Sequence, residues 1–154
     1  MQSYSVSFAR VTGANGQIRR YPLLPVLLDI KGMVFHVNFL LDSGSDHSFL
    51  SRAFVQDGLG IHIEDLPQGE IQQGLGGTFS TGIIKGKIKF GPAQSPFMEE
   101  IDFVVSKDRT IEPNFCLLGR EPFFDHYRID FRMGWRKLGS CGKFTIYQER
   151  MKSK

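Results

Sequence analysis

The chain has few cysteines, no long apolar run and no recognisable export signal. Only two of its 154 residues are cysteines, Cys116 and Cys141, and their spacing fits neither a metal site nor a disulfide framework. We therefore expect two free thiols, no metal and a reducing compartment. The apolar stretch at 22–28 is far shorter than the ~20 residues of a membrane-spanning helix. Because no basic start leads into an apolar segment after Met1, we expect a cytoplasmic protein.

The chain also lacks a strong excess of one charge. Its 19 basic and 16 acidic residues give a formal net charge of +3, and both kinds are scattered. The basic end at 150–154 is more typical of a solvated terminus than of a nucleic-acid surface. We therefore expect neither nucleic acid nor a membrane as a partner.

Helical signals are scarce, whereas the period-two alternation of half-buried strands is common. We expect strands near 4–8, 25–30, 33–41, 83–90, 101–105, 128–131, 135–138 and 143–147. Turns are expected at Asn15-Gly16, Lys31-Gly32 and Met133-Gly134. Pro122 can begin a short helix over 121–127, and 51–57 can supply a further helical turn. The pattern predicts one all-β domain over 1–154, a closed or partly closed barrel with one short C-terminal helix.

The most informative stretch is an apolar strand that runs into Asp42-Ser43-Gly44-Ser45. An acid at the end of a buried strand costs free energy unless nearby amides or hydroxyls satisfy it, and the following Ser-Gly can do so. An ordinary turn would explain the tripeptide equally well. At average residue usage Asp-(Ser/Thr)-Gly occurs by chance in roughly one chain in fifteen of this length.

Two later segments occur in an order that adds to this motif. Residues 73–77 form a glycine-dense tip between strand-like stretches, where backbone can approach a ligand closely. A second apolar stretch then runs from Phe115 through Leu117-Leu118 into Gly119-Arg120. Taken singly, these segments are a flexible hairpin and a strand that ends at glycine.

Together the three segments resemble the retroviral-type, or retropepsin-like, aspartic proteases over about residues 22–131. That family has two apolar residues before Asp-(Thr/Ser)-Gly-(Ala/Ser), a glycine-rich flap, and two apolar residues before Gly-Arg-(Asn/Asp). Glu121 departs from the last position, and about 23 residues follow Phe131 where retroviral members end.

The resemblance implies roles for individual residues. Asp42, Ser43 and Gly44 would form the catalytic turn, and Asp46 would pair with a buried Arg120 beside Gly119. The residues expected to contact substrate are Leu40, Phe49 and Leu117 in apolar pockets, and Gly74, Leu75, Gly76 and Gly77 in the flap.

The chain has only one Asp-(Ser/Thr)-Gly, whereas this chemistry uses two facing carboxylates. The expected enzyme is therefore a homodimer, an aspartic endopeptidase that cleaves polypeptide without a cofactor. Trp135, Phe144, Ile146 and Tyr147 need a partner surface, in their own barrel or in the second protomer. By analogy with the shared sheet of retroviral members, we expect some of the segment 132–154 at the interface.

Two other interpretations remain open. The chain could be a non-catalytic, pepsin-fold binding or dimerisation module that keeps the motif without turnover. It could also be a small all-β ligand-binding barrel in which Asp42 is only a turn residue. Neither His36 nor His47 has a Ser or Cys partner pattern, which argues against a hydrolase triad.

Overall fold

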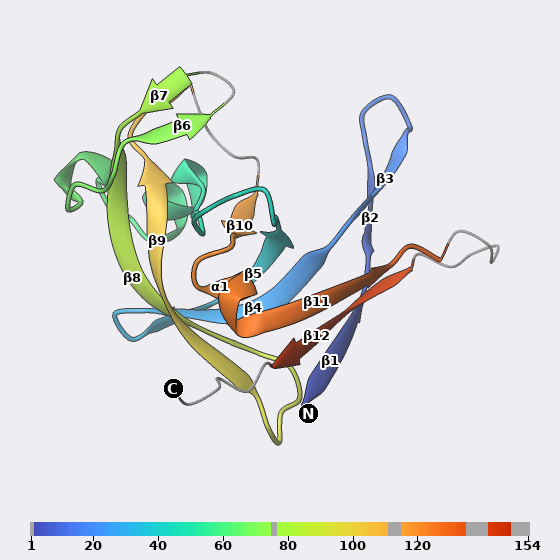
Figure 1. The fold of residues 1–154 in the computed structure, drawn as a ribbon. Coiled ribbons are helices and arrows are strands. Elements are labelled where there is room, and N and C mark those ends of the chain that lie inside the picture. The colour runs from blue at the N-terminus through green and yellow to red at the C-terminus, as the bar shows by residue number, and fades with distance from the viewer. Residues whose placement is uncertain (1, 75–76, 111–114, 135–141, 149–154) are drawn as a thin grey trace.

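The computed structural model describes residues 2–74, 77–110, 115–134 and 142–148, and it consists mostly of strands. Figure 1 shows a strongly curled main sheet from which hairpins project. The strands of this sheet are β4 (Leu23–Ile30), β5 (Met33–Leu41), β8 (Thr81–Phe90), β9 (Phe97–Ser106) and β10 (Cys116–Leu118). Their order is β10-β5-β4-β8-β9, with β10 and β5 parallel and the other neighbours antiparallel.

A short segment around Phe49 closes this sheet into a barrel. The backbone N–H of Phe49 donates to Leu117 of β10 at 2.9 Å, and Leu117 donates back at 2.8 Å. On its other side, Val104 of β9 donates to the carbonyl of Ser48 at 2.9 Å, and Leu50 donates to Val104 at 3.0 Å. The segment thus joins the two edge strands, and a ring of backbone hydrogen bonds leaves no open edge at these residues. The expected all-β barrel is confirmed.

The hairpin of β4 and β5 sets the register that positions Asp42. Lys31 and Gly32 both have positive φ, 52° and 83°, which is the geometry of a two-residue turn matched to the twist of the strands. The Asp29 carboxylate accepts a hydrogen bond from the backbone N–H of Gly32 at 2.8 Å and fixes the turn. Leu23 consequently lies opposite Leu40.

A second, three-stranded sheet joins the two ends of the described chain. It contains β1 (Ser3–Ser7), β12 (Lys143–Gln148) and β11 (Tyr127–Arg132), with β12 in the middle. Phe144 and Ile146 of β12 are fully buried in the core of their own protomer. Of the two partner surfaces left open for these residues, the structure therefore shows the chain's own barrel, and the expectation that some of 132–154 lies at a dimer interface stays a prediction. Trp135 and the strand expected over 135–138 lie outside the described residues.

The remaining elements are short. Two hairpins project, one of β2 (Ala9–Thr12) and β3 (Ile18–Tyr21), the other of β6 (Gln72–Gly74) and β7 (Gly77–Phe79). The helical segments are a π-helical turn at Phe54–Gly58, a 3-10 turn at Ile63–Asp65 and α1 (Phe123–His126). The expected helix over 121–127 is thus confirmed in part, because Pro122 caps α1 instead of lying inside it. Within the described ranges, no helix is long and apolar enough to cross a membrane.

Aromatic side chains fill the core of the barrel. Phe39 stacks on Phe103 at 5.5 Å, and Phe90 contacts Phe97 and Tyr127 at 5.1 and 5.5 Å. Cys116 is a free and buried thiol, and its burial raises its pKa. Cys141, the other expected free thiol, lies outside the described residues.

Candidate active site

Asp42 directly follows β5 and continues its hydrogen-bond ladder. Its backbone N–H donates to the carbonyl of Leu118 at 3.0 Å. Because side chains alternate along an extended chain, Asp42 faces the same side of the sheet as Leu40. Asp42 is half-buried, whereas Ser43 and Gly44 are exposed. One carboxylate oxygen accepts from the backbone N–H of Gly44 at 2.9 Å, which holds the side chain against its own turn.

The residues after β10 hold this turn from behind. The backbone carbonyl of Ser45 accepts from the backbone N–H of Arg120 at 2.8 Å. The backbone carbonyl of Asp46 accepts from the backbone N–H of Glu121 at 2.9 Å. The backbone N–H of Gly119 donates to the buried hydroxyl of Ser48 at 3.1 Å. A Cβ on Gly119 would lie 2.1 Å from the carbonyl oxygen of His47, so only glycine fits there. The contact between Gly119-Arg120 and the Asp42 turn is therefore built from backbone.

Arg120 and Asp46 form an ion pair, as expected. The expectation that Arg120 is buried is wrong, because the two side chains are 57% and 60% exposed in the protomer. Arg120 follows the buried Leu118 and Gly119, but at the end of β10 its side chain turns to the surface. The pair therefore adds little to the backbone bonds beside it.

An apolar strip leads across the barrel toward Asp42. Leu23 lies opposite Leu40, Leu40 opposite Leu117, and Leu117 opposite Phe49, and all four are half-buried. The structure thus brings together Leu40, Phe49 and Leu117, the three residues expected to line pockets. Sequence reasoning missed three neighbours that extend the strip: Leu23, Tyr21 and Phe115, of which the last two are in ring contact at 5.2 Å.

The strands on either side of the glycine-dense tip pair as a hairpin. Gly74 of β6 and Gly77 of β7 lie opposite each other, and Gly77 has a φ of 110°, which favours glycine. Leu75 and Gly76 lie outside the described residues. In the view of Figure 1, this hairpin and the β2–β3 hairpin rise on either side of the end of β5 and β10.

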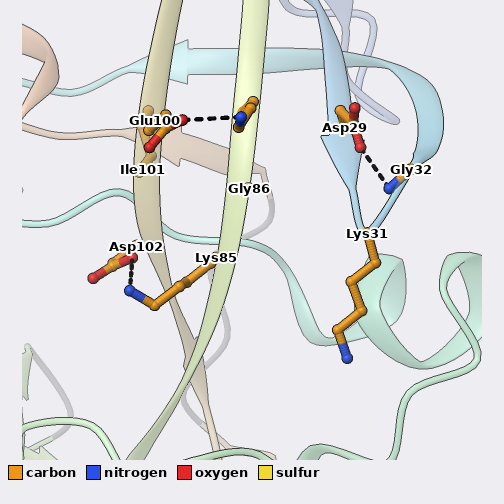
Figure 2. Close-up of a pocket in the computed structure, with 9 residues that line it drawn as sticks. Asp29, Lys31, Gly32, Lys85, Gly86, Glu100, Ile101 and Asp102 are labelled. Carbon is orange, nitrogen blue, oxygen red and sulfur yellow. Dashed lines mark hydrogen bonds and ion pairs between the residues drawn. The ribbon is translucent and has the colours of Figure 1, made fainter.

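A cavity of about 520 Å³ lies away from this site, by the turn that precedes β5. Figure 2 shows the Asp29 carboxylate of β4 directed at Gly32 of the turn, with Lys31 beside it on one side of the cavity and Lys85 and Asp102 on the other. These strands carry two exposed ion pairs, Lys85–Asp102 at 3.4 Å and Lys87–Glu100 at 3.0 Å. The positive and negative side chains that line the cavity therefore neutralise one another. Across the described ranges, no three His, Cys, Asp or Glu side chains gather as metal ligands would.

Comparison with solved structures identifies the fold. A retropepsin-like aspartic protease from Rickettsia conorii matches with a TM-score of 0.54 and 14% sequence identity, over 95% of this chain and 92% of that one. The EIAV protease complexed with the inhibitor HBY-793 has 24% identity over 75% of this chain and 93% of its own. Its TM-score of 0.48 is too low to add to the assignment. No protein-family model matches the chain, and no curated protein matches its sequence. The chain has the fold of the retropepsin-like aspartic proteases.

Proposed function

We propose that this chain is an aspartic endopeptidase that acts as a homodimer, with one Asp42 from each protomer. The observation that carries the proposal is the position of Asp42. The side chain lies at the end of a barrel strand, in a turn fixed by backbone bonds, beside a half-buried apolar strip.

The chemistry of the proposed site follows from two facing carboxylates. Like charges at close range cannot both ionise easily, so the proposed pair shares one proton. The ionised Asp42 takes a proton from water as that water attacks the scissile carbonyl carbon. The protonated Asp42 gives its proton to the carbonyl oxygen, which leaves a gem-diol. As the C–N bond breaks, the Asp42 that took the water proton gives it to the leaving nitrogen, and a gem-diol hydroxyl returns a proton to the other Asp42, so that the products are a carboxylic acid and an amine.

The other predicted residues have roles around the substrate. Leu40, Phe49 and Leu117 would hold apolar side chains of the polypeptide, and the half-exposed strip suits that role. The exposed Ser43 would hydrogen-bond across the two-fold axis, and Gly44 would leave room for the substrate backbone. The β6–β7 hairpin would cover the bound chain as a flap and exclude water.

The test compares wild-type protein with Asp42→Asn on a peptide library between pH 4 and 7. We expect wild-type protein to cleave peptides with apolar residues at the scissile bond. The cleavage rate of Asp42→Asn should be lower by a factor of about a thousand or more. Asp57→Asn is the matched control, because Asp57 is an exposed acid of the π-helical turn. A folded Asp42→Asn protein with full activity would rule out the proposal. A wild-type dimer that binds peptides without cleaving them would favour the binding module instead.

A further inference from the structure

The β2–β3 hairpin and its turn, residues 9–21, form an arginine-bearing arm. Figure 1 shows it standing away from the barrel. The first acidic residue of the chain is Asp29, so the arm contains Arg10, Arg19 and Arg20 and no acid. Outside the arm, the remaining 16 basic residues equal the 16 acidic residues in number. The whole formal excess of +3 is therefore on this one hairpin.

Among the described residues, these charges have no acidic counterpart. All three arginines are exposed, and none forms an ion pair with a described residue. Arg20 makes one long bond, from its guanidinium to the carbonyl of Met133 at 3.4 Å. Arg10 lies directly opposite Arg20, and like charges in facing positions destabilise a hairpin. A lone two-stranded hairpin is only marginally stable in water. The facing arginines therefore do not serve the stability of the arm.

The base of the arm adjoins the candidate active site. Leu41, the residue before Asp42, donates its backbone N–H to the carbonyl of Pro22 at 3.0 Å. Tyr21, the last residue of the arm, contacts Phe115 just before β10. Side chains two positions apart share a side of a strand, so Arg19 extends from the same side of β3 as Tyr21, the residue that contacts Phe115. Arg10 and Arg20 lie on the other side.

We propose that the arm binds acidic side chains of the polypeptide substrate, in the part that flanks the apolar segment held near Asp42. The proposal rests on the proposed function, because it names the substrate class of that same site. Guanidinium groups recognise carboxylates through paired hydrogen bonds, and an uncompensated positive arm speeds the approach of an acidic chain. A nucleic acid is the less favoured polyanion. The arm has only three cations, divided between two sides, and its single aromatic ring already packs on Phe115.

The test measures binding to the Asp42→Asn protein, so that no turnover is required. The probe is a dye-labelled apolar hexapeptide with four Glu on one side, and its partner carries four Gln instead. By fluorescence anisotropy at 50 mM NaCl we expect the Glu peptide to bind at least about tenfold more tightly, and high salt to remove the difference. Changing Arg10, Arg19 and Arg20 together to Gln should remove the preference, and Arg19→Gln alone should remove most of it.

The matched control replaces three exposed lysines of β8, Lys85, Lys87 and Lys89, by Gln and should keep the preference. Circular dichroism establishes that each variant is folded. Equal affinity for the two peptides, or a preference that survives in the arm variant, would overturn the proposal. So would a single-stranded oligonucleotide that binds the arm more tightly than the Glu peptide. If the preference is present but wild-type protein cleaves nothing, the arm still recognises acidic chains and only the proposed protease activity fails.

Discussion

Gly119 shows how a residue without a side chain can fix the geometry of a site. Its backbone N–H reaches the buried Ser48 hydroxyl, and the carbonyl oxygens of Ser45 and His47 would lie 2.8 and 2.1 Å from a Cβ placed there. The turn that carries Asp42 therefore packs on bare backbone. Any larger residue must push the turn and the Gly-Arg segment apart.

We predict that Gly119→Ala lowers the free energy of unfolding by about 3 kcal/mol or more and abolishes cleavage, because the clash is with backbone that cannot rotate away. Thermal and urea unfolding measure the first effect. Gly74→Ala is the control for stability, since a Cβ there would meet only the Phe79 ring at an ordinary 3.4 Å. Equal stabilities for the two variants would contradict the packing described for Gly119.

Arg120→Ala should have a much smaller effect on the isolated protomer. The Asp46–Arg120 pair is exposed, and exposed pairs are worth up to ~1 kcal/mol. The backbone bonds from Arg120 and Glu121 to the Asp42 turn survive the substitution. Urea unfolding of dilute protein, compared with Lys85→Ala in the similarly exposed pair to Asp102, measures this. A loss of 3 kcal/mol, the cost of breaking a buried pair, would mean that another surface covers Arg120.

The part of the site that could be predicted from the sequence is the part that stands in motifs of residues close together in the chain. Asp42, Leu40 and Leu117 stand in local motifs that predict their proximity, and the structure brings them together. Leu23 was missed although the turn at 31–32 contains the signal: counting back from it pairs Leu23 with Leu40. Tyr21 and Phe115 were not predictable, because they are 94 positions apart and meet only when the barrel closes. The exposure of Arg120 likewise depends on where β10 ends.

Among the strands, β12 contributes most to joining the ends of the fold. Its inner residues pack into the core, and its two neighbours are β1 and β11. Ile146→Ala should cost about 2–5 kcal/mol through lost burial and the cavity left behind. Thr145→Ala, which loses only an exposed bond to the Ser5 hydroxyl at 2.8 Å, should cost under ~1 kcal/mol. Urea unfolding compares the two, and similar losses would show that β12 does not seal the core.

The contact of β11 with β9 predicts a loss of stability in strong base. Burial and the neighbouring Glu99 carboxylate raise the pKa of Tyr127 to about 12. Because the folded state favours the neutral phenol, its contribution is complete below the unfolded pKa of ~10 and is lost as the pH rises through 12. The free energy of unfolding should therefore fall more steeply from pH 10 to 12 in wild-type protein than in Tyr127→Phe. Tyr147→Phe, a half-exposed control, should keep the wild-type slope.

Element prediction succeeded where alternation and turn chemistry coincide. The β4–β5 hairpin and the final strand were expected within one or two residues of their observed ends. Pro122 began the only expected C-terminal helix, but the return to strand at Tyr127 limited α1 to four residues. Closure of the barrel by Phe49 could not be predicted, because its partners Leu117 and Val104 are remote in sequence and no local pattern marks a strand at 48–50.

At the scale of the whole molecule, the chain has one Asp-(Ser/Thr)-Gly, so the proposed chemistry needs a second copy to supply its second carboxylate. In the described ranges the chain closes its own barrel and pairs β12 with both β1 and β11, so these strands find their neighbours within one chain. Assembly would then serve the chemistry more than the core. We expect a dimer that dissociates on dilution, with specific activity falling as protomers separate. This distinguishes it from a chain whose stability depends on the interface.

A mixing experiment tests that assembly directly. When wild-type protein is mixed with an equal amount of Asp42→Asn above the dimer dissociation constant, random exchange leaves about a quarter of the dimers with two intact carboxylates. Activity per wild-type chain should therefore fall by about half, because every hybrid dimer lacks one member of the proton-sharing pair. Adding Asp57→Asn chains instead should leave activity per competent chain unchanged, since the exposed Asp57 is remote from the chemistry. If adding Asp42→Asn leaves the activity per wild-type chain unchanged, one protomer holds a complete site. The second Asp42 would then have no role.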